Sequence, residues 1–313
     1  MSAERGHTYG GQAVIEGVMI RGRNNVSVAV RRPDGTIAMQ SRLLSPLFTG
    51  RLRRVPLVRG VIALIETLVL GMRALSYSAN VGMEEEGAEV SKTSMALMTA
   101  VSLLLALGLF FLVPVFASRG LEGVLGSDYA TNIAEGLIRL GIFLAYILLI
   151  GRMSDIRRVF MYHGAEHMAV HAQERGDVLS LESVRKYSTA HPRCGTAFLL
   201  VVMVVAIIVF VVVGREPLWW LITSRIVLMP FIAAVSYELI RLSGRYSANP
   251  LVGLITGPSL ALQALTTREP EDDQIEIAIE AMKRTLEVDD TGIVLVESQY
   301  GGAESAPDEA GQA

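Results

Sequence analysis

The 313-residue chain has little cysteine, little charge and few aromatic side chains. Cys194 is the single cysteine, which excludes a disulfide framework within the chain. Charged residues make up 19%, below the roughly 25% of an ordinary soluble domain, whereas apolar residues make up 51%. The net charge of −3 lacks the positive excess typical of nucleic-acid-binding proteins, so we expect no nucleic-acid partner.

The surplus of apolar residues is concentrated in long runs. Residues 95–117 and 196–213 contain no charged side chain, and a helix needs about 20 such residues to cross a bilayer. The runs 133–151 and 217–240 carry two charges each, and the tryptophan pair near the start of the latter is typical of a membrane interface. The sequence therefore predicts an α-helical integral membrane protein with about four transmembrane helices.

A fifth apolar segment, residues 57–79, carries Arg59, Glu66 and Arg73 at seven-residue spacing. A step of seven residues returns to nearly the same side of a helix, so these charges form one polar stripe. An amphipathic or re-entrant helix at the membrane surface is one interpretation. The other is a helix whose polar stripe faces a buried polar site.

Basic residues are distributed unevenly among the connections between these runs. Residues 152–195 contain seven arginines and lysines, whereas 118–132 and 214–216 contain one each. Because cytoplasmic connections carry the excess of basic residues, we expect residues 152–195 and both termini in the cytoplasm. The chain is thus predicted to lie in the inner (cytoplasmic) membrane, in contact with membrane lipids.

The parts outside the apolar runs predict a small cytoplasmic α+β unit. A first strand is expected over residues 12–20, and Pro33-Asp34-Gly35 between two later strands is a typical hairpin turn. Helical spacing over 272–287 precedes a short strand over 293–297 that we expect to join the hairpin. The predicted division is a β-rich cytoplasmic hairpin module (1–50), an interfacial helix with a linker (51–94), a membrane domain containing the histidine-rich loop (95–250), a C-terminal helix and strand (251–297) and a disordered tail (298–313).

Four of the five histidines and the single cysteine lie in the connection 152–195. His163, Glu166 and His167 form an H-x-x-E-H sequence, in which positions four apart share a helix face and can chelate a divalent ion. His191 and Cys194, in the sequence HPRCGT, add imidazole and thiol groups that suit zinc. We predict a metal site held by His163, His167, His191 and Cys194, with Glu166 as the general base.

Three further polar residues have open roles. His171 lies one turn beyond the H-x-x-E-H sequence, and on a straight helix it is rotated away from a shared ion. Glu238 is either part of a local ion pair or an additional metal ligand. Glu16 is expected to pair with a cation such as Arg21, because an unpaired carboxylate among apolar residues is costly. A polar loop without metal, with Cys194 as an inert buried thiol, is the competing interpretation of the whole cluster.

Five sequence motifs occur in a distinctive order: GGQAVIEGVMIRG at 10–22, HGAEH at 163–167, HPRCGT at 191–196, YELIRLSGR at 237–245 and LTTREPEDDQIEIAI at 265–279. Together they resemble the bacterial YqhQ family, membrane proteins of unknown function that are labelled predicted metal-dependent enzymes. The resemblance implies metal at His163, His167 and His191, and it implies that the GGQAVIEG segment belongs to the working unit. Met168 departs from the lysine expected after HGAEH in relatives, which puts any role of that lysine in doubt here.

These observations support three functions. The first is a metal-dependent membrane hydrolase that acts on a lipid-linked or membrane-embedded substrate at the cytoplasmic face. The second is a non-catalytic membrane scaffold or assembly factor that docks partners through the N-terminal hairpin and the C-terminal helix. The third is a metal transporter or sensor, whose path would depend on Arg139, Arg225 and Glu238. Two of these side chains are cations, which suit a metal-ion path poorly.

Overall fold

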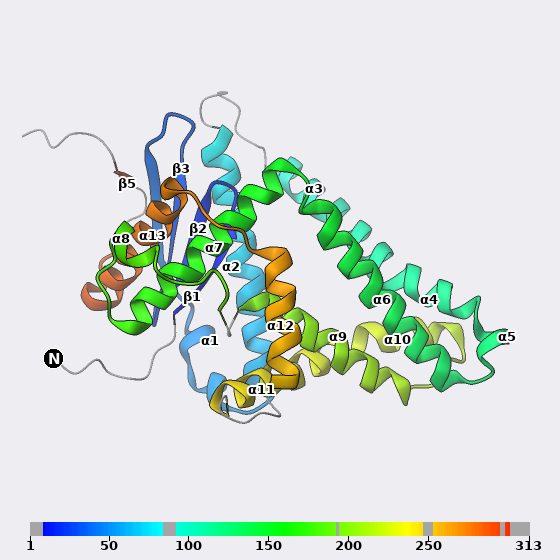
Figure 1. The fold of residues 1–313 in the computed structure, drawn as a ribbon. Helices are drawn as coiled ribbons and strands as arrows, with labels where there is room; N and C mark the ends of the chain where they lie inside the picture. Colours follow the sequence, from blue (N-terminus) through cyan, green and yellow to red (C-terminus); the bar gives the residue numbers. More distant parts are fainter. Residues whose placement is uncertain (1–8, 84–91, 192–193, 247–252, 295–297, 301–313) are drawn as a thin grey trace, which may run out of the picture.

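The computed structural model describes residues 9–83, 92–191, 194–246, 253–294 and 298–300. Figure 1 shows two parts, a sheet with helices on both faces and a set of apolar helices that extends away from the sheet. Residues 84–91 of the predicted linker and residues 301–313 of the predicted tail lie outside the described residues.

The sheet is an antiparallel meander in the order β1 (Gly10–Val14), β2 (Gly17–Arg21), β3 (Asn25–Arg31), β4 (Ile37–Leu43) and β5 (Ser298–Tyr300). The predicted hairpin is present as β3 and β4. The single strand predicted over 12–20 is wrong, because a two-residue turn at Ile15 and Glu16 divides it into β1 and β2. A C-terminal strand, β5, pairs with β4 at residues 298–300, where the sequence predicted the start of a disordered tail. Residues 295–297 of the strand predicted over 293–297 lie outside the described residues.

Both faces of the sheet are covered by helices. Val18 and Ile20 pack toward α7 (Ser154–Arg175) and α13 (Asp272–Thr291), whereas Met19 and Val28 pack toward α2 (Val58–Met83). Neighbouring residues of a strand point to opposite faces, so both sets of side chains become buried. A sheet covered on both faces therefore has nearly continuous apolar strands, in place of the alternation of a half-exposed sheet.

The amphipathic segment predicted over 57–79 forms α2, which follows the short helices α1 (Pro46–Thr49) and η1 (Arg51–Arg54). Leu70 and Ala74, on its buried side, pack against the sheet. Nearer its start, a Cβ on Gly60 would lie 2.8 Å from the Cα of Ala234 on α11 (Met229–Arg245), so only glycine permits this close approach. Helix α2 thus connects the sheet to the apolar helices.

Of the three charges in the predicted polar stripe of α2, only Glu66 is buried. Its carboxylate accepts hydrogen bonds from Arg21 at 3.0 Å and from Arg53 at 2.5 Å. Arg59 is partly exposed and pairs with Glu238 of α11, and Arg73 is exposed. The stripe therefore faces no single polar site, although Glu66 does occupy a buried ionic contact between α2 and the sheet.

The apolar part contains α3 (Lys92–Leu107), η3 (Gly108–Leu112), α4 (Val113–Arg119), α5 (Glu122–Leu125), α6 (Asp128–Ile150), α9 (Gly195–Val211), α10 (Leu218–Val227), α11 and α12 (Gly253–Thr266), while α8 (Leu181–Val184) lies near α7. Two helices in the described residues are long and apolar enough to cross a membrane, Ala96–Arg119 and Asp128–Ile150.

The two other predicted spans differ from regular membrane helices. The run 196–213 forms α9, whose 17 residues fall below the roughly 20 needed to cross a bilayer. The run 217–240 forms α10 and α11, which are bent by 40° and would make a third span only if taken together. The expectation of about four transmembrane helices is therefore reduced to two, or three with the bent pair, in the part of the chain that the structure describes.

Buried charges join the apolar helices to one another. Glu135 on α6 is 1% exposed and accepts hydrogen bonds from Arg139 at 2.9 Å, Arg215 at 2.8 Å and Arg225 at 3.0 Å. Arg215 also contacts Glu122 at 3.1 Å. Three cations thus share two carboxylates, and the cations connect α6 with α10 and with the connection that precedes it.

A π-helical turn, η3, interrupts the helix that continues from α3 into α4. Such a turn shifts the backbone hydrogen bonds from i−4 to i−5 and can leave a carbonyl free for another donor. The carbonyl of Phe110 in η3 accepts a hydrogen bond from Nε of Arg139 at 2.9 Å. The backbone of this first apolar helix is therefore bonded directly to a side chain of α6.

Replacing Glu66 tests the ionic contact between α2 and the sheet. We expect Glu66→Gln to lower the free energy of unfolding by about 2 to 3 kcal/mol, because two partly buried arginines lose their carboxylate partner. The matched change Glu276→Gln removes a carboxylate that is 56% exposed and pairs with Arg31, and it should cost less than about 1 kcal/mol. Denaturant unfolding of both variants in one detergent measures the difference, and equal losses would contradict the assignment.

Candidate metal centre

Helix α7 carries the H-x-x-E-H sequence and is buried along most of that stretch. It ends at Gly176, whose φ of 75° is the left-handed conformation that glycine adopts readily at a helix end. His163, His167 and His171 follow one another at four-residue steps, which places them in a row along one side of the helix. Thr189, Ala190 and Cys194 contact this row.

Backbone carbonyls fix the three imidazoles of the row. Nδ1 of His163 is 2.9 Å from the carbonyl of Thr266, and Nδ1 of His167 is 2.6 Å from that of Thr189. Nε2 of His171 is 2.9 Å from the carbonyl of residue 190. A carbonyl only accepts, so each of these nitrogens carries the proton and the other ring nitrogen keeps a lone pair. Metal-binding histidines are typically oriented in this way.

The first group of potential ligands is His163, His167 and Cys194, whose ligand atoms lie within 4.8 Å of one another. Nε2 of His163 is 3.2 Å from Sγ of Cys194. Cys194 is buried and immediately precedes α9, where its sulfur also accepts a hydrogen bond from the backbone N–H of Thr196 at 3.4 Å. Two imidazoles and a thiol therefore lie close enough together to bind one ion. They belong to three of the four predicted ligands, His163, His167 and Cys194.

The fourth predicted ligand, His191, belongs to a different group. Its ligand atom lies within 4.8 Å of those of His171 and Glu174, and its Nε2 is 3.4 Å from a carboxylate oxygen of Glu174. The backbone of His191 is held by Gln263 of α12, whose side-chain amide accepts a hydrogen bond from the N–H of His191 and donates one to its carbonyl, both at 2.9 Å. This clamp directs His191 one turn farther along α7 than the sequence predicts. Glu174 is not among the ligands predicted from the sequence. Its position three residues after His171, on the same side of the helix, could have indicated it.

Glu166 lies beside the first group but outside it. The residue is 3% exposed, and one carboxylate oxygen is 3.5 Å from Nε2 of His167. Burial raises the pKa of the Glu166 carboxyl and lowers the pKa of the His167 imidazole, since each charged form loses its hydration. A hydrogen bond that the N–H of Gly11 on β1 donates to Glu166 acts in the opposite direction, because it stabilises the carboxylate and lowers the pKa of Glu166.

Glycines allow the surrounding segments to reach this centre. A Cβ on Gly11 would lie 2.9 Å from Cγ of Glu166, so the GGQAVIEG segment covers that side chain closely. A Cβ on Gly164 would lie only 2.3 Å from the carbonyl oxygen of Arg268. The N–H of Arg268 in turn donates to the carbonyl of Phe160 at 2.9 Å. Residues from four of the five ordered motifs, those at 10–22, 163–167, 191–196 and 265–279, thus lie together at α7.

The open roles of Glu16 and Glu238 are resolved by their contacts. Both oxygens of Glu16 accept hydrogen bonds from Arg158 on α7 at 2.6 Å, and the hydroxyl of Tyr162 donates to it at 3.1 Å. The expected partner Arg21 is therefore wrong. Glu238 pairs with Arg59 of α2 and accepts a bond from a backbone N–H there, so it serves as a link between helices rather than as a ligand.

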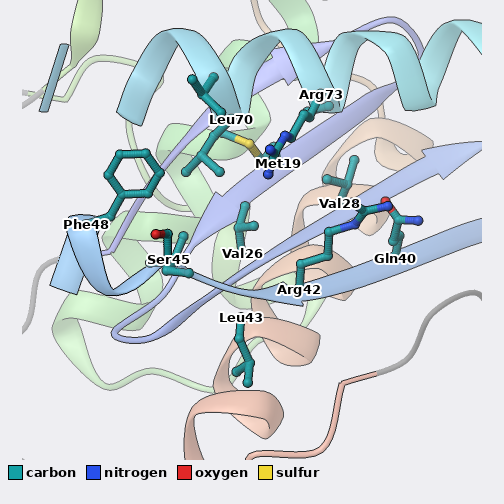
Figure 2. Close-up of a pocket in the computed structure, with 13 residues that line it drawn as sticks. Met19, Val26, Val28, Gln40, Arg42, Leu43, Ser45, Phe48, Leu70 and Arg73 are labelled. Atoms are coloured by element: carbon teal, nitrogen blue, oxygen red, sulfur yellow. The ribbon is translucent and has the colours of Figure 1, made fainter. Parts of the chain in front are cut away.

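A separate cleft of about 230 Å³ lies between the sheet and α2, on the face opposite α7. Figure 2 shows that its lining includes the cationic side chains of Arg42 and Arg73 and the apolar side chains of Met19, Val26 and Leu70. No histidine, cysteine or carboxylate lines it within the described residues. The cleft is therefore not part of the metal centre.

The fold and the site define a protein of apolar helices whose small sheet closes over a buried cluster of histidine, cysteine and glutamate. The chain belongs to the family described as "Protein of unknown function (DUF1385)", which matches residues 55–288. It is 34% identical over 296 residues to the "Uncharacterized protein YqhQ" of Bacillus subtilis (strain 168), which covers 90% of this chain and 93% of that protein. The family resemblance seen in the motifs is thus confirmed. No solved structure matches the chain.

Adding one methyl group at Gly164 tests the approach of residue 268 to α7. We expect Gly164→Ala to lower the free energy of unfolding by about 1 to 3 kcal/mol, because the new Cβ would collide with a backbone carbonyl. Gly141→Ala on α6 is the control, since a Cβ there meets nothing within 4 Å and alanine favours helix by up to about 1 kcal/mol. Thermal unfolding compares the two, and a neutral Gly164→Ala would refute the close packing.

The bond between Glu16 and Arg158 predicts a pH-dependent contribution to stability. Hydrogen bonding to Arg158 holds the pKa of Glu16 below its ordinary value of 4.5. A carboxyl group with a lowered folded-state pKa stabilises the fold above its unfolded pKa, and this gain disappears as the pH falls through the folded-state pKa. We therefore expect Glu16→Gln to be less stable than wild type at pH 7, with a gap that narrows below about pH 4.5.

Melting curves at neutral and acidic pH measure this gap. The variant Arg158→Met, which lacks the partner of Glu16, serves as the control. When Glu16→Gln is introduced into this variant, the resulting change in stability should depend less on pH than it does in the wild type. A gap that stays constant down to about pH 3 would show that ionisation of Glu16 does not contribute.

Proposed function

We propose that this protein is a metal-dependent membrane hydrolase whose divalent ion, zinc by its ligand chemistry, is held by His163, His167 and Cys194. The convergence of these three ligand atoms within 4.8 Å is the observation that carries the proposal. Catalytic zinc sites use three protein ligands drawn from histidine, cysteine and carboxylate, and keep a further position open. The fixed ring orientations of both histidines fit this donor set.

Glu166 is the proposed general base. It is adjacent to the ligand His167 and is held between α7 and β1, so its carboxylate has little freedom to move. A divalent ion would supply Lewis-acid chemistry that polarises a carbonyl or phosphoryl oxygen of the substrate. Glu166 would accept the proton of the attacking water. His163 is only partly buried, and a substrate would enter from its side.

The membrane assignment rests on the two long apolar helices and on the charge of the connections. Helices Ala96–Arg119 and Asp128–Ile150 have lengths and compositions that suit two spans, and the bent pair α10 and α11 suits a re-entrant loop, which leaves both termini on the same side of the membrane. Seven basic residues in 152–195 favour a cytoplasmic position for α7 and for both termini at the inner membrane. A substrate that is lipid-linked or embedded in the membrane would suit a centre joined so closely to these helices.

Transport of a metal ion has weaker support. The buried polar cluster of the apolar helices contains three arginines and two carboxylates, and its cations would repel a metal ion. Docking of partners through the sheet, as in a scaffold or assembly factor, is the function that would remain if the centre binds no metal.

Metal content of the detergent-purified protein tests the proposal. We expect zinc to stay bound through dialysis against a weak chelator and the variant His163→Ala, His167→Ala to lose it, as measured by elemental mass spectrometry. Cobalt loading gives a second readout, because a thiolate ligand produces a ligand-to-metal absorption band that Cys194→Ser should abolish. Circular dichroism and melting curves verify that each variant is folded.

Glu166→Gln separates binding from catalysis. Since Glu166 lies outside the ligand group, the variant should keep its metal, and it should lose about 100-fold or more in turnover of any substrate that the protein hydrolyses. Folded protein that binds no ion, or hydrolysis unaffected in Glu166→Gln, would overturn the metal site and the base assignment respectively.

A further inference from the structure

We infer that α7 carries a second divalent-cation site, formed by His171, Glu174 and His191, one helical turn beyond the first group. The ligand atoms of these three side chains lie within 4.8 Å of one another. The inference adds a second ion to the proposed hydrolase and rests on that function only for its catalytic meaning, since the site can be measured on its own.

The same physical features that define the first group recur in the second. His171 donates from Nε2 to a backbone carbonyl at 2.9 Å, so its ring is fixed in one tautomer and Nδ1 keeps the lone pair. His191 is buried, and Gln263 clamps its backbone on both sides. Two of the three ligands are therefore positioned before an ion arrives, which reduces the cost of ordering them on binding.

The donor set differs chemically from that of the first group. Two imidazoles and one carboxylate are a common set for zinc, and for iron or manganese when water fills the open positions. No thiol takes part, and Glu174 is exposed, so this site opens to solvent. We expect it to exchange its ion more readily than the buried site that contains Cys194.

The two groups are direct neighbours. The ring centroids of His167 and His191 are 5.7 Å apart, while His163 and His167 are 4.4 Å apart and His171 and His191 are 4.5 Å apart. The three imidazoles of α7 and that of His191 thus form one continuous group of rings. Hydrolases with paired ions use the second ion to stabilise charge on the attacking or the leaving oxygen, and this arrangement would place both ions in one centre.

Counting bound ions tests the inference. Protein loaded with zinc and separately with cobalt should contain about two ions per chain, as in paired-ion sites. Glu174→Gln and His171→Ala should each lower this to about one, with the thiolate-to-cobalt band of the first site unchanged. Glu182→Gln, which removes an exposed carboxylate elsewhere in the same connection, is the matched control and should keep both ions.

The outcomes distinguish this inference from the proposed function. One ion that is lost in His163→Ala, His167→Ala but kept in Glu174→Gln would overturn the second site and leave the first in place. One ion that is lost only in Glu174→Gln and His171→Ala, with no thiolate band in wild type, would support the second site and overturn the first. Folded wild-type protein that binds no ion would overturn both.

Discussion

The centre depends on one constraint, the position of α7 between the sheet and two later parts of the chain, residues 189–190 and 266–268. Carbonyls at residues 189, 190 and 266 orient the three imidazoles of α7, and Gly11 and Gly164 allow backbone to approach within contact of the helix. None of these groups would bind a metal. They determine instead which nitrogen of each histidine is available, and so order the donor atoms of a histidine-rich helix into two groups that could each hold an ion.

Local sequence patterns predicted much of the fold. The hairpin at Pro33-Asp34-Gly35 and the helix over 272–287 both follow from spacing and turn chemistry. The break at Ile15 and Glu16 was not predictable, because Glu16 adopts a positive φ of 49° that its bonds to Arg158 and Tyr162 support. These partners lie more than 140 residues away.

The candidate site shows the same limit. Four-residue spacing predicted that His163 and His167 share one side of a helix, and the structure places Cys194 beside them. The division of the remaining donors could not be deduced, because the direction of His191 depends on Gln263, an unremarkable polar residue in an apolar helix. Hydropathy likewise located the apolar runs but not the bend between α10 and α11, since composition does not report where a helix turns.

The order of the elements along the chain has a consequence for biogenesis. Strands β1 to β4 are synthesised first, but α13, which covers one face of their sheet, follows roughly 230 residues later. At about 5 to 20 residues per second, this interval lasts about 12 to 46 s. During it the sheet face that α13 later covers, and the edge of β4 that later pairs with β5, remain unpaired. Exposed strand edges favour association with other chains. The carbonyl of Thr266 is also synthesised about 100 residues after His163, so the histidine centre can be completed only after that interval.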